Sequence, residues 1–164
     1  MKTLFLLRHA KSSWDSPTLD DFERPLNRRG TDNAATMAIR MDKITLLPET
    51  IYCSTATRAR QTVEIMRQGS TLQNSNLVLE EDIYMADSRL LLILISNLDD
   101  SIQRVMLVGH NPGFTNLLNT LQAETIDNMP TCSVAILELN IDIWSQIGPD
   151  LGHLAHYDYP KKPH

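Results

Sequence analysis

The sequence predicts an α/β fold, a three-layer α/β/α sandwich with a mostly parallel central sheet, formed by one domain over residues 1–164. Short apolar runs typical of buried strands alternate along the chain with segments of helical periodicity. The length of 164 residues suits a single domain that can bury a sizeable core. The chain also contains no repeat and no low-complexity linker that would divide it.

Five apolar runs are predicted to form strands, and a sixth has a weaker pattern. They cover Thr3 to Leu7, Thr50 to Ser54, Leu77 to Glu80, Arg104 to Val108 and Ser133 to Leu139, with the weaker one at His153 to Tyr157. The stretch from Ser133 through Leu139 to Trp144 reads as strand, turn and strand. This pattern favours an antiparallel edge on an otherwise parallel sheet.

Four segments between these runs have helical spacing. The first is expected to start at a Thr31 cap, after a turn that ends at Gly30. The second covers Thr57 to Gln68, and Gly69 ends it. The third helix is expected to start at a cap formed by Asp87 or Ser88, and the fourth is expected to start at Pro112-Gly113. Helices between parallel strands predict right-handed crossovers that cover both faces of the sheet.

Composition and charge argue against several function classes. The net charge of -5 is unfavourable for a general nucleic-acid or acidic-membrane binder. No segment approaches the ~18 consecutive apolar residues of a membrane span, and the apolar start ends at Arg8, far short of a signal peptide. Cys53 and Cys132 have no metal-ligand spacing and are predicted to be buried free thiols. We therefore expect a cytoplasmic protein.

Chemistry-bearing residues follow three of the predicted strands. Arg8-His9 ends the first strand, Arg58 lies in the first turn after the second, and His110 follows the fourth. The carboxyl ends of parallel strands meet at one edge of a sheet, where open α/β sheets bind their ligands. Arginine offers a planar fork of donors to phosphate, and histidine can act as a base or nucleophile. The sequence therefore predicts a dianion pocket that contains a nucleophile.

Four segments, in this order, resemble the histidine phosphatase superfamily, the group that includes the phosphoglycerate mutases. They are Leu6-Leu7-Arg8-His9-Ala10-Lys11-Ser12, Arg24-Pro25-Leu26-Asn27-Arg28-Arg29-Gly30, Cys53-Ser54-Thr55-Ala56-Thr57-Arg58-Ala59-Arg60-Gln61-Thr62 and Val108-Gly109-His110-Asn111-Pro112-Gly113. The resemblance covers the chain from Lys2 to about Pro160. Because Ala10 replaces the glycine of the RHG signature and the chain is small, it looks most like the SixA-type branch, small phosphatases that act on phosphohistidine.

The resemblance implies a phosphoglycerate mutase-like fold and a role for each site residue. His9 matches the histidine that is transiently phosphorylated. Arg8 and Arg58 match the arginines that hold the phosphate, and His110 matches the second histidine of that pocket. Glu81 falls where mutase-like members place the acid that protonates the leaving group. The resemblance thus implies a metal-independent phosphatase with no cofactor.

Other residues are expected to lie outside this chemistry. Asp15 falls where mutase-like members carry a phosphate-contacting asparagine, and we expect it outside the pocket because a carboxylate would repel phosphate. Strand periodicity puts His153 and His156 on opposite faces, which disfavours a metal pair. Predicted structural residues are Arg24, Arg28 and Arg29 for the loop and helix entry, and Trp14 and Trp144 for packing.

Three functions fit these residues. The first is hydrolysis of a phosphohistidine-containing protein through phospho-His9. The second is a phosphatase or mutase of a small phosphorylated metabolite that uses the same residues. The third is a non-catalytic phosphoprotein-binding module, although a pure binder has no need of a nucleophile. Since His9 must be neutral to attack, activity is expected to fall as the pH drops through the ordinary histidine range.

Overall fold

The structure is a computed structural model that describes residues 1–164. One mixed sheet contains β1 (Lys2–Arg8), β2 (Thr50–Cys53), β3 (Asn76–Leu79), β4 (Arg104–Gly109), β5 (Val134–Leu139) and β6 (Gly152–Asp158). The strand order is β3-β2-β4-β1-β5-β6, and the first four of these strands are parallel to one another. β5 is antiparallel to β1, and β6 is antiparallel to β5. The predicted mostly parallel sheet with an antiparallel edge is confirmed.

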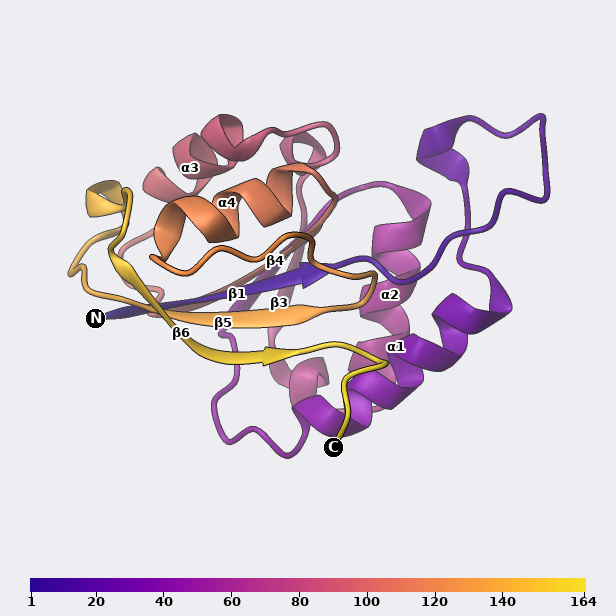
Figure 1. The fold of residues 1–164 in the computed structure, drawn as a ribbon, viewed down its shortest axis with the longest axis horizontal. Helices are drawn as coiled ribbons and strands as arrows, with labels where there is room; N and C mark the ends of the chain where they lie inside the picture. Colours follow the sequence, from indigo (N-terminus) through magenta and orange to yellow (C-terminus); the bar gives the residue numbers. More distant parts are fainter.

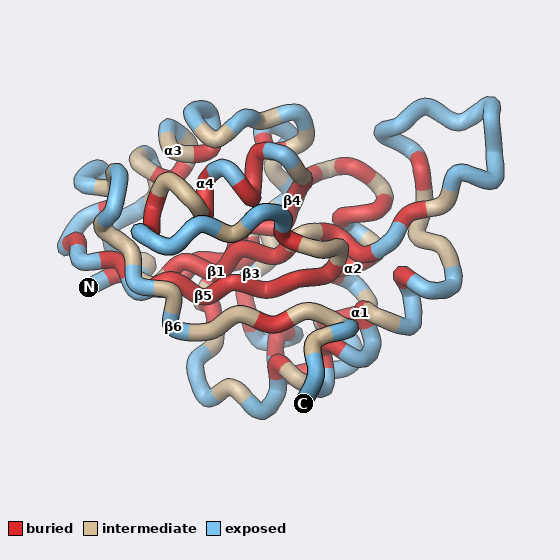
Figure 2. Tube along the Cα trace, viewed as in Figure 1, coloured by how far each residue is buried: buried red, intermediate tan, exposed pale blue.

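Helices cover both faces of the sheet, as the α/β/α prediction requires (Figure 1). α1 (Arg28–Met41) and α2 (Thr57–Gln68) share one face, and α3 (Ser88–Ser96) and α4 (Gly113–Leu121) share the other. The central strand β1 alternates between the two cores, with Phe5 and Leu7 on the α1–α2 side and Leu4 and Leu6 on the α3–α4 side. All four side chains are buried, and Figure 2 shows the central strands as the most enclosed part of the chain. Burial on both faces explains the unbroken apolar run.

The start of α1 corrects the predicted cap. The helix begins at Arg28, and the Asn27 side chain accepts a hydrogen bond from the Gly30 N–H at 2.8 Å. Gly30 therefore lies in the first turn and does not end a preceding turn. A Cβ at Gly30 would stand 2.1 Å from the Lys11 carbonyl oxygen. Close packing of α1 on the segment after His9 thus determines where the helix starts, rather than the capping propensity of Thr31.

The chain after β5 also differs from the expectation of a second strand near Trp144. Residues Trp144–Gln146 form a short 3-10 helix, and the antiparallel partner of β5 is β6. Trp144 is buried as predicted, and its Nε1 donates to the Ile102 carbonyl at 2.9 Å. Its role is packing and hydrogen bonding at the edge of the sheet opposite the site.

The carboxyl ends of β1, β2 and β4 meet at one edge of the sheet (Figure 1). The loop between β1 and α1 projects beyond this edge and carries η1 (Asp21–Glu23), a short 3-10 helix. A second short 3-10 helix, η3 (Glu81–Ile83), follows β3. None of the helices combines the length and apolar character that crossing a bilayer would require.

Candidate active site

His9 is held at the end of β1 by its backbone and by its own ring. Its N–H donates to the Gly109 carbonyl at 3.0 Å, and its carbonyl accepts from Cys132 at 3.0 Å. Cys132 has a φ of 62°, a left-handed conformation that is uncommon for a residue with a side chain. The ring Nδ1 lies 2.7 Å from the Ala10 carbonyl oxygen. Because a carbonyl can only accept, Nδ1 carries the proton and Nε2 keeps its lone pair.

The Arg58 side chain donates a hydrogen bond to the lone pair of His9 Nε2. Its Nε donates to His9 Nε2 at 3.3 Å, and both side chains are buried. The backbone around the pair is joined through Thr62, whose hydroxyl accepts from the Ala10 N–H at 3.0 Å and donates to the Arg58 carbonyl at 2.7 Å. The first turns of α2 are thereby bonded to the segment that follows His9. An incoming phosphoryl group would replace His9 as the acceptor for Arg58 Nε.

His110 is the second ring of the pocket. Its centroid lies 5.1 Å from that of His9. Its Nε2 is 2.7 Å from the Ser54 hydroxyl, which also accepts from the Ala56 N–H at 3.2 Å. Its Nδ1 is buried and has no hydrogen-bond partner. Ser54 therefore orients the His110 ring from β2 and leaves one ring nitrogen available.

Arg8 approaches from the other side of the site, next to the segment before β5. Its Nη1 donates to the Met129 carbonyl at 2.7 Å, and its Nε is buried without a partner. Asn111 donates to the same carbonyl at 3.0 Å. Burial lowers the pKa of Arg8, with a further contribution from the charge of Arg58. The two guanidinium groups are thus close enough to repel each other, an arrangement that a bound dianion would relieve.

Burial keeps both histidines neutral. It is the largest cause that lowers the pKa of His9 to about 3, and the charges of Arg58 and Arg8 act in the same direction. The pKa of His110 is lowered to about 4, again mainly by burial. The neutral form of His9 therefore persists well below the ordinary histidine range, so His9 does not supply the protonation on which the expected fall of activity was based. A neutral imidazole therefore lies among fixed positive charges. The pH dependence of activity itself stays a prediction.

Asp21 and Tyr84 also belong to the site, although the sequence reasoning missed them. The Asp21 carboxylate accepts from Arg58 Nη2 at 3.1 Å and from the Tyr84 hydroxyl at 2.6 Å, and its carbonyl accepts from Arg58 Nη1 at 2.7 Å. The Tyr84 hydrogen bond is the largest cause that lowers the pKa of Asp21 to about 2. Asp21 lies in a long loop without periodicity, so no local pattern marked it.

Arg24 holds the Asp21 loop in place. It donates to the Asp21 carboxylate at 2.9 Å, to the Ser13 carbonyl at 3.0 Å and to the Ser12 hydroxyl. Its guanidinium carbon lies 3.2 Å from the centroid of the Trp14 ring. Arg24 therefore stabilises the loop as predicted, while Trp14 covers Arg24 and is itself 72% exposed.

Glu81 and Asp15, the two acidic residues that the sequence places near or outside the predicted pocket, are both exposed. Glu81 lies on η3, and its side chain makes no hydrogen bond, whereas Tyr84 at the end of the same turn reaches the site. Its role as proton donor stays a prediction. Asp15 is also exposed, and its backbone N–H bonds within its own loop to Ser13. Asp15 makes no hydrogen bond or ion pair with the four predicted pocket residues, which agrees with its expected place outside the pocket.

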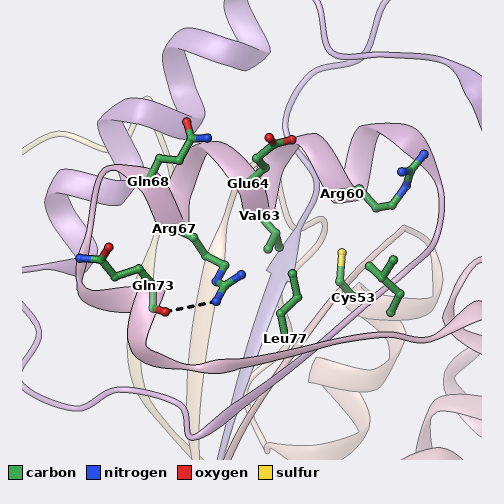
Figure 3. A pocket seen from close by; sticks show the side chains of 9 residues that line it. Cys53, Arg60, Val63, Glu64, Arg67, Gln68, Gln73 and Leu77 are labelled. Carbon is green, nitrogen blue, oxygen red and sulfur yellow. Dashed lines mark hydrogen bonds between the residues drawn. The ribbon is translucent and has the colours of Figure 1, made fainter.

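A separate cavity of about 620 Å³ lies between α2 and β3 and includes none of these site residues (Figure 3). Arg67, which faces it, donates to the backbone carbonyls of Leu72, Gln73 and Ser75. Burial raises the pKa of Cys53 at its floor to about 12. This cavity is therefore separate from the cluster of histidines and arginines at the strand edge. No cluster of three or more His, Cys, Asp or Glu side chains suited to a metal ion occurs in the structure.

Comparisons with known proteins agree with this geometry. Residues 4–83 match the model of the histidine phosphatase superfamily, branch 1. An uncharacterized chloroplastic protein of Arabidopsis thaliana is 31% identical over 153 residues, which are 88% of this chain and 70% of that protein. An uncharacterized protein of Mycobacterium tuberculosis is 27% identical and covers 94% of this chain and 100% of its own length.

Solved structures give the same result. A crystal structure assigned as the phosphohistidine phosphatase SixA of Agrobacterium tumefaciens has a TM-score of 0.83 and 30% identity, over 97% of this chain and 98% of that one. The protein histidine phosphatase SixA in complex with tungstate has a TM-score of 0.79 at 22% identity, which shows the fold, over 96% of this chain and 97% of that one. This chain is a phosphatase of the histidine phosphatase superfamily and belongs to its SixA-type branch.

Proposed function

We propose that this protein is a metal-independent phosphohistidine phosphatase that transfers the phosphoryl group to Nε2 of His9 and then to water. The observation that carries the proposal is the approach of Arg58 Nε to within 3.3 Å of that nitrogen, whose lone pair is kept free by the Nδ1–H bond to Ala10. The 30% identity to a chain assigned as SixA, over nearly the full length of both, supports phosphohistidine as the donor.

The first step transfers the phosphoryl group to the enzyme. The Nε2 lone pair of His9 attacks phosphorus, and a P–Nε2 bond forms as the donor P–N bond breaks. The bonding electron pair leaves with the donor imidazole, which departs neutral because its other nitrogen carries a proton. Phosphoryl transfer passes through a loose transition state, so alignment and charge stabilisation by Arg8 and Arg58 supply most of the catalysis.

The second step restores the enzyme. Water attacks phosphorus, the P–Nε2 bond breaks, and its electron pair returns to His9. The proton of the water leaves with the phosphate product or passes to solvent, and the Nδ1–H bond to Ala10 is unchanged throughout. Splitting the displacement in two through a covalent intermediate lowers each barrier. A proton donor such as Glu81 is less important here than for an ester, because imidazole is already a good leaving group.

The experiment uses a protein phosphorylated chemically on histidine with phosphoramidate. The wild type is expected to release inorganic phosphate and, when trapped with radiolabelled donor, to carry acid-labile, base-stable phosphate. His9→Ala should lose both signals, whereas His156→Ala on β6 should keep them. Wild-type turnover by His9→Ala would refute the proposed nucleophile.

The other two functions are tested by adding phosphorylated metabolites to this experiment and by measuring binding of the phosphorylated protein. A phosphoenzyme that discharges to a second metabolite faster than to water would identify a mutase. Phosphate-dependent binding without any phospho-His9 would identify a binding module.

We also infer a reducing compartment such as the cytoplasm, because Cys53 and Cys132 are both buried free thiols.

A further inference from the structure

One wall of the active site is anionic although its floor is cationic. η1 and η3 form this wall, and we call residues 20–24 and 80–84 together the acidic wall. The two parts are joined by the Tyr84–Asp21 hydrogen bond of 2.6 Å and by edge-to-face packing of Phe22 on Tyr84 at 4.9 Å. Tyr84 also packs edge-on against the His110 ring at 5.5 Å. The wall is therefore in direct contact with the phosphate pocket.

The wall presents almost only negative charge to solvent. Its members with carboxylates are Asp20, Asp21, Glu23, Glu80, Glu81 and Asp82. Its one cation, Arg24, is buried beneath Trp14 and paired with Asp21. By contrast, Arg58 and Arg8 lie on the floor, where the neutral histidines add no charge. A substrate thus meets positive charge at its phosphoryl group and negative charge beside its leaving group.

Asp21 is the member of the wall that can act most strongly on a substrate. Its carboxylate lies 3.1 Å from Arg58 Nη2, and its side chain is 48% exposed. It is the only carboxylate hydrogen-bonded to a guanidinium of the pocket floor. A phosphoryl group bound to Arg58 would therefore share this guanidinium with the Asp21 carboxylate.

We propose that Asp21 is a specificity-determining residue, whose carboxylate makes the site prefer phosphoryl donors with a neutral or cationic leaving group over donors that carry a further anionic group. This inference rests on the proposed function and deepens it. A phosphorylated basic side chain, with no acid of its own, has the favoured charge. A small metabolite with a second phosphate or a carboxylate has the disfavoured one.

The test uses three aryl phosphates that carry substituents of different charge at the same distant ring position. They are 4-carboxyphenyl, 4-carbamoylphenyl and 4-(aminomethyl)phenyl phosphate, and kcat/KM is measured for each. In Asp21→Asn the ratio of the cationic to the anionic substrate should fall about tenfold from the wild-type ratio, the effect of one unit charge across a partly exposed site. Comparing ratios between enzymes cancels the intrinsic reactivity of each ester.

Two controls separate charge from structure. Asp142→Asn removes an exposed acid at the opposite edge of the sheet and should leave the ratio unchanged. Tyr84→Phe keeps the Asp21 charge and should preserve most of the ratio while lowering all three rates. In the wild type the ratio should also decrease from low to about 0.5 M salt, which tests the inference even where Asp21→Asn does not fold.

Equal loss for all three substrates in Asp21→Asn would overturn the inference, because Asp21 would then only position Arg58. A wild-type ratio independent of salt would overturn it as well. In both cases His9-dependent turnover would remain, and the proposed function would stand. If the histidine-phosphorylated protein yields no phospho-His9 in the wild type, the proposed function fails and the inference fails with it.

Discussion

Replacing Thr62 with valine tests whether the bond between α2 and the segment after His9 supports catalysis. Thr62 is fully buried, and its hydroxyl is the partner of the Ala10 N–H at 3.0 Å and of the Arg58 carbonyl at 2.7 Å. Valine has nearly the same shape but no hydroxyl. The variant therefore leaves the Ala10 N–H unpaired in the protein interior without opening a cavity.

The expected cost follows from that unpaired donor. A buried polar group left without a partner costs about 1–3 kcal/mol. For a domain of this size each kcal/mol lowers Tm by about 2–4 °C, so Thr62→Val should melt about 2–12 °C below the wild type. The Ala10 carbonyl that fixes the His9 Nδ1 proton is in the same residue. A more mobile Ala10 would hold the His9 ring less firmly. Formation of phospho-His9 should therefore slow about tenfold, which is equivalent to ~1.4 kcal/mol of activation free energy.

Thermal unfolding followed by circular dichroism gives the first number, and a single-turnover measurement of phosphoenzyme gives the second. Thr62→Ser is the matched control, because it keeps the hydroxyl and removes only a methyl group. It should retain most of the rate. The reasoning is refuted if Thr62→Val melts and reacts like the wild type, or if Thr62→Ser slows phosphoenzyme formation as much as valine does.

Three further variants or titrations follow from the site. The pKa of His9, lowered to about 3, predicts that its ring stays neutral at pH 5, and NMR titration of the ring carbon would contradict this if it changed near pH 6.5. Because the folded pKa of His9 lies below its unfolded value, the free energy of unfolding should fall as the pH drops below about 6.5, and His9 contributes up to about 2 kcal/mol of the loss at pH 5. Urea unfolding should therefore show a smaller loss in His9→Ala, and His110, whose pKa is also lowered, accounts for part of the loss that remains. Arg58→Lys cannot reproduce the contacts of Nε and both Nη atoms, so kcat should fall about 10²-fold, and wild-type kcat would exclude those contacts from catalysis. Ser54→Ala leaves His110 Nε2 unpaired and should lower both Tm and kcat, whereas an effect on Tm alone would show that the hydroxyl does not orient the ring for catalysis.

The fold was predictable because its strongest signals are local. A strand buried on both faces must be apolar throughout, and β1 is buried from Leu4 to Leu7. The convergence of His9, Arg58 and His110 was also predictable, since the ends of parallel strands share an edge whatever their separation in sequence. The Thr57–Gln68 helix has the predicted bounds because its spacing and its final glycine agree.

What could not be predicted depends on contacts between distant segments. Asn27 and Thr31 are both good caps, and the packing of Gly30 on Lys11 decides between them. Asp21 gains its role only because a loop without periodicity folds back onto Arg58. The lowered pKa of His9 was unpredictable for a related reason: residue type gives the ordinary pKa of histidine, but the degree of burial exists only in the folded chain.

The neutrality of His9 and the proposed binding of phosphate have one physical origin. The guanidinium groups of Arg8 and Arg58 attract a dianion, and the same charges, together with burial, disfavour a proton on His9 and on His110. A bound phosphoryl group reverses part of this effect, because its negative charge raises the pKa of a neighbouring histidine. His110, with an unpaired Nδ1, is therefore the ring best placed to gain a proton once the substrate is bound. In the proposed mechanism His9 does not gain a proton at Nε2, because that nitrogen forms the bond to phosphorus.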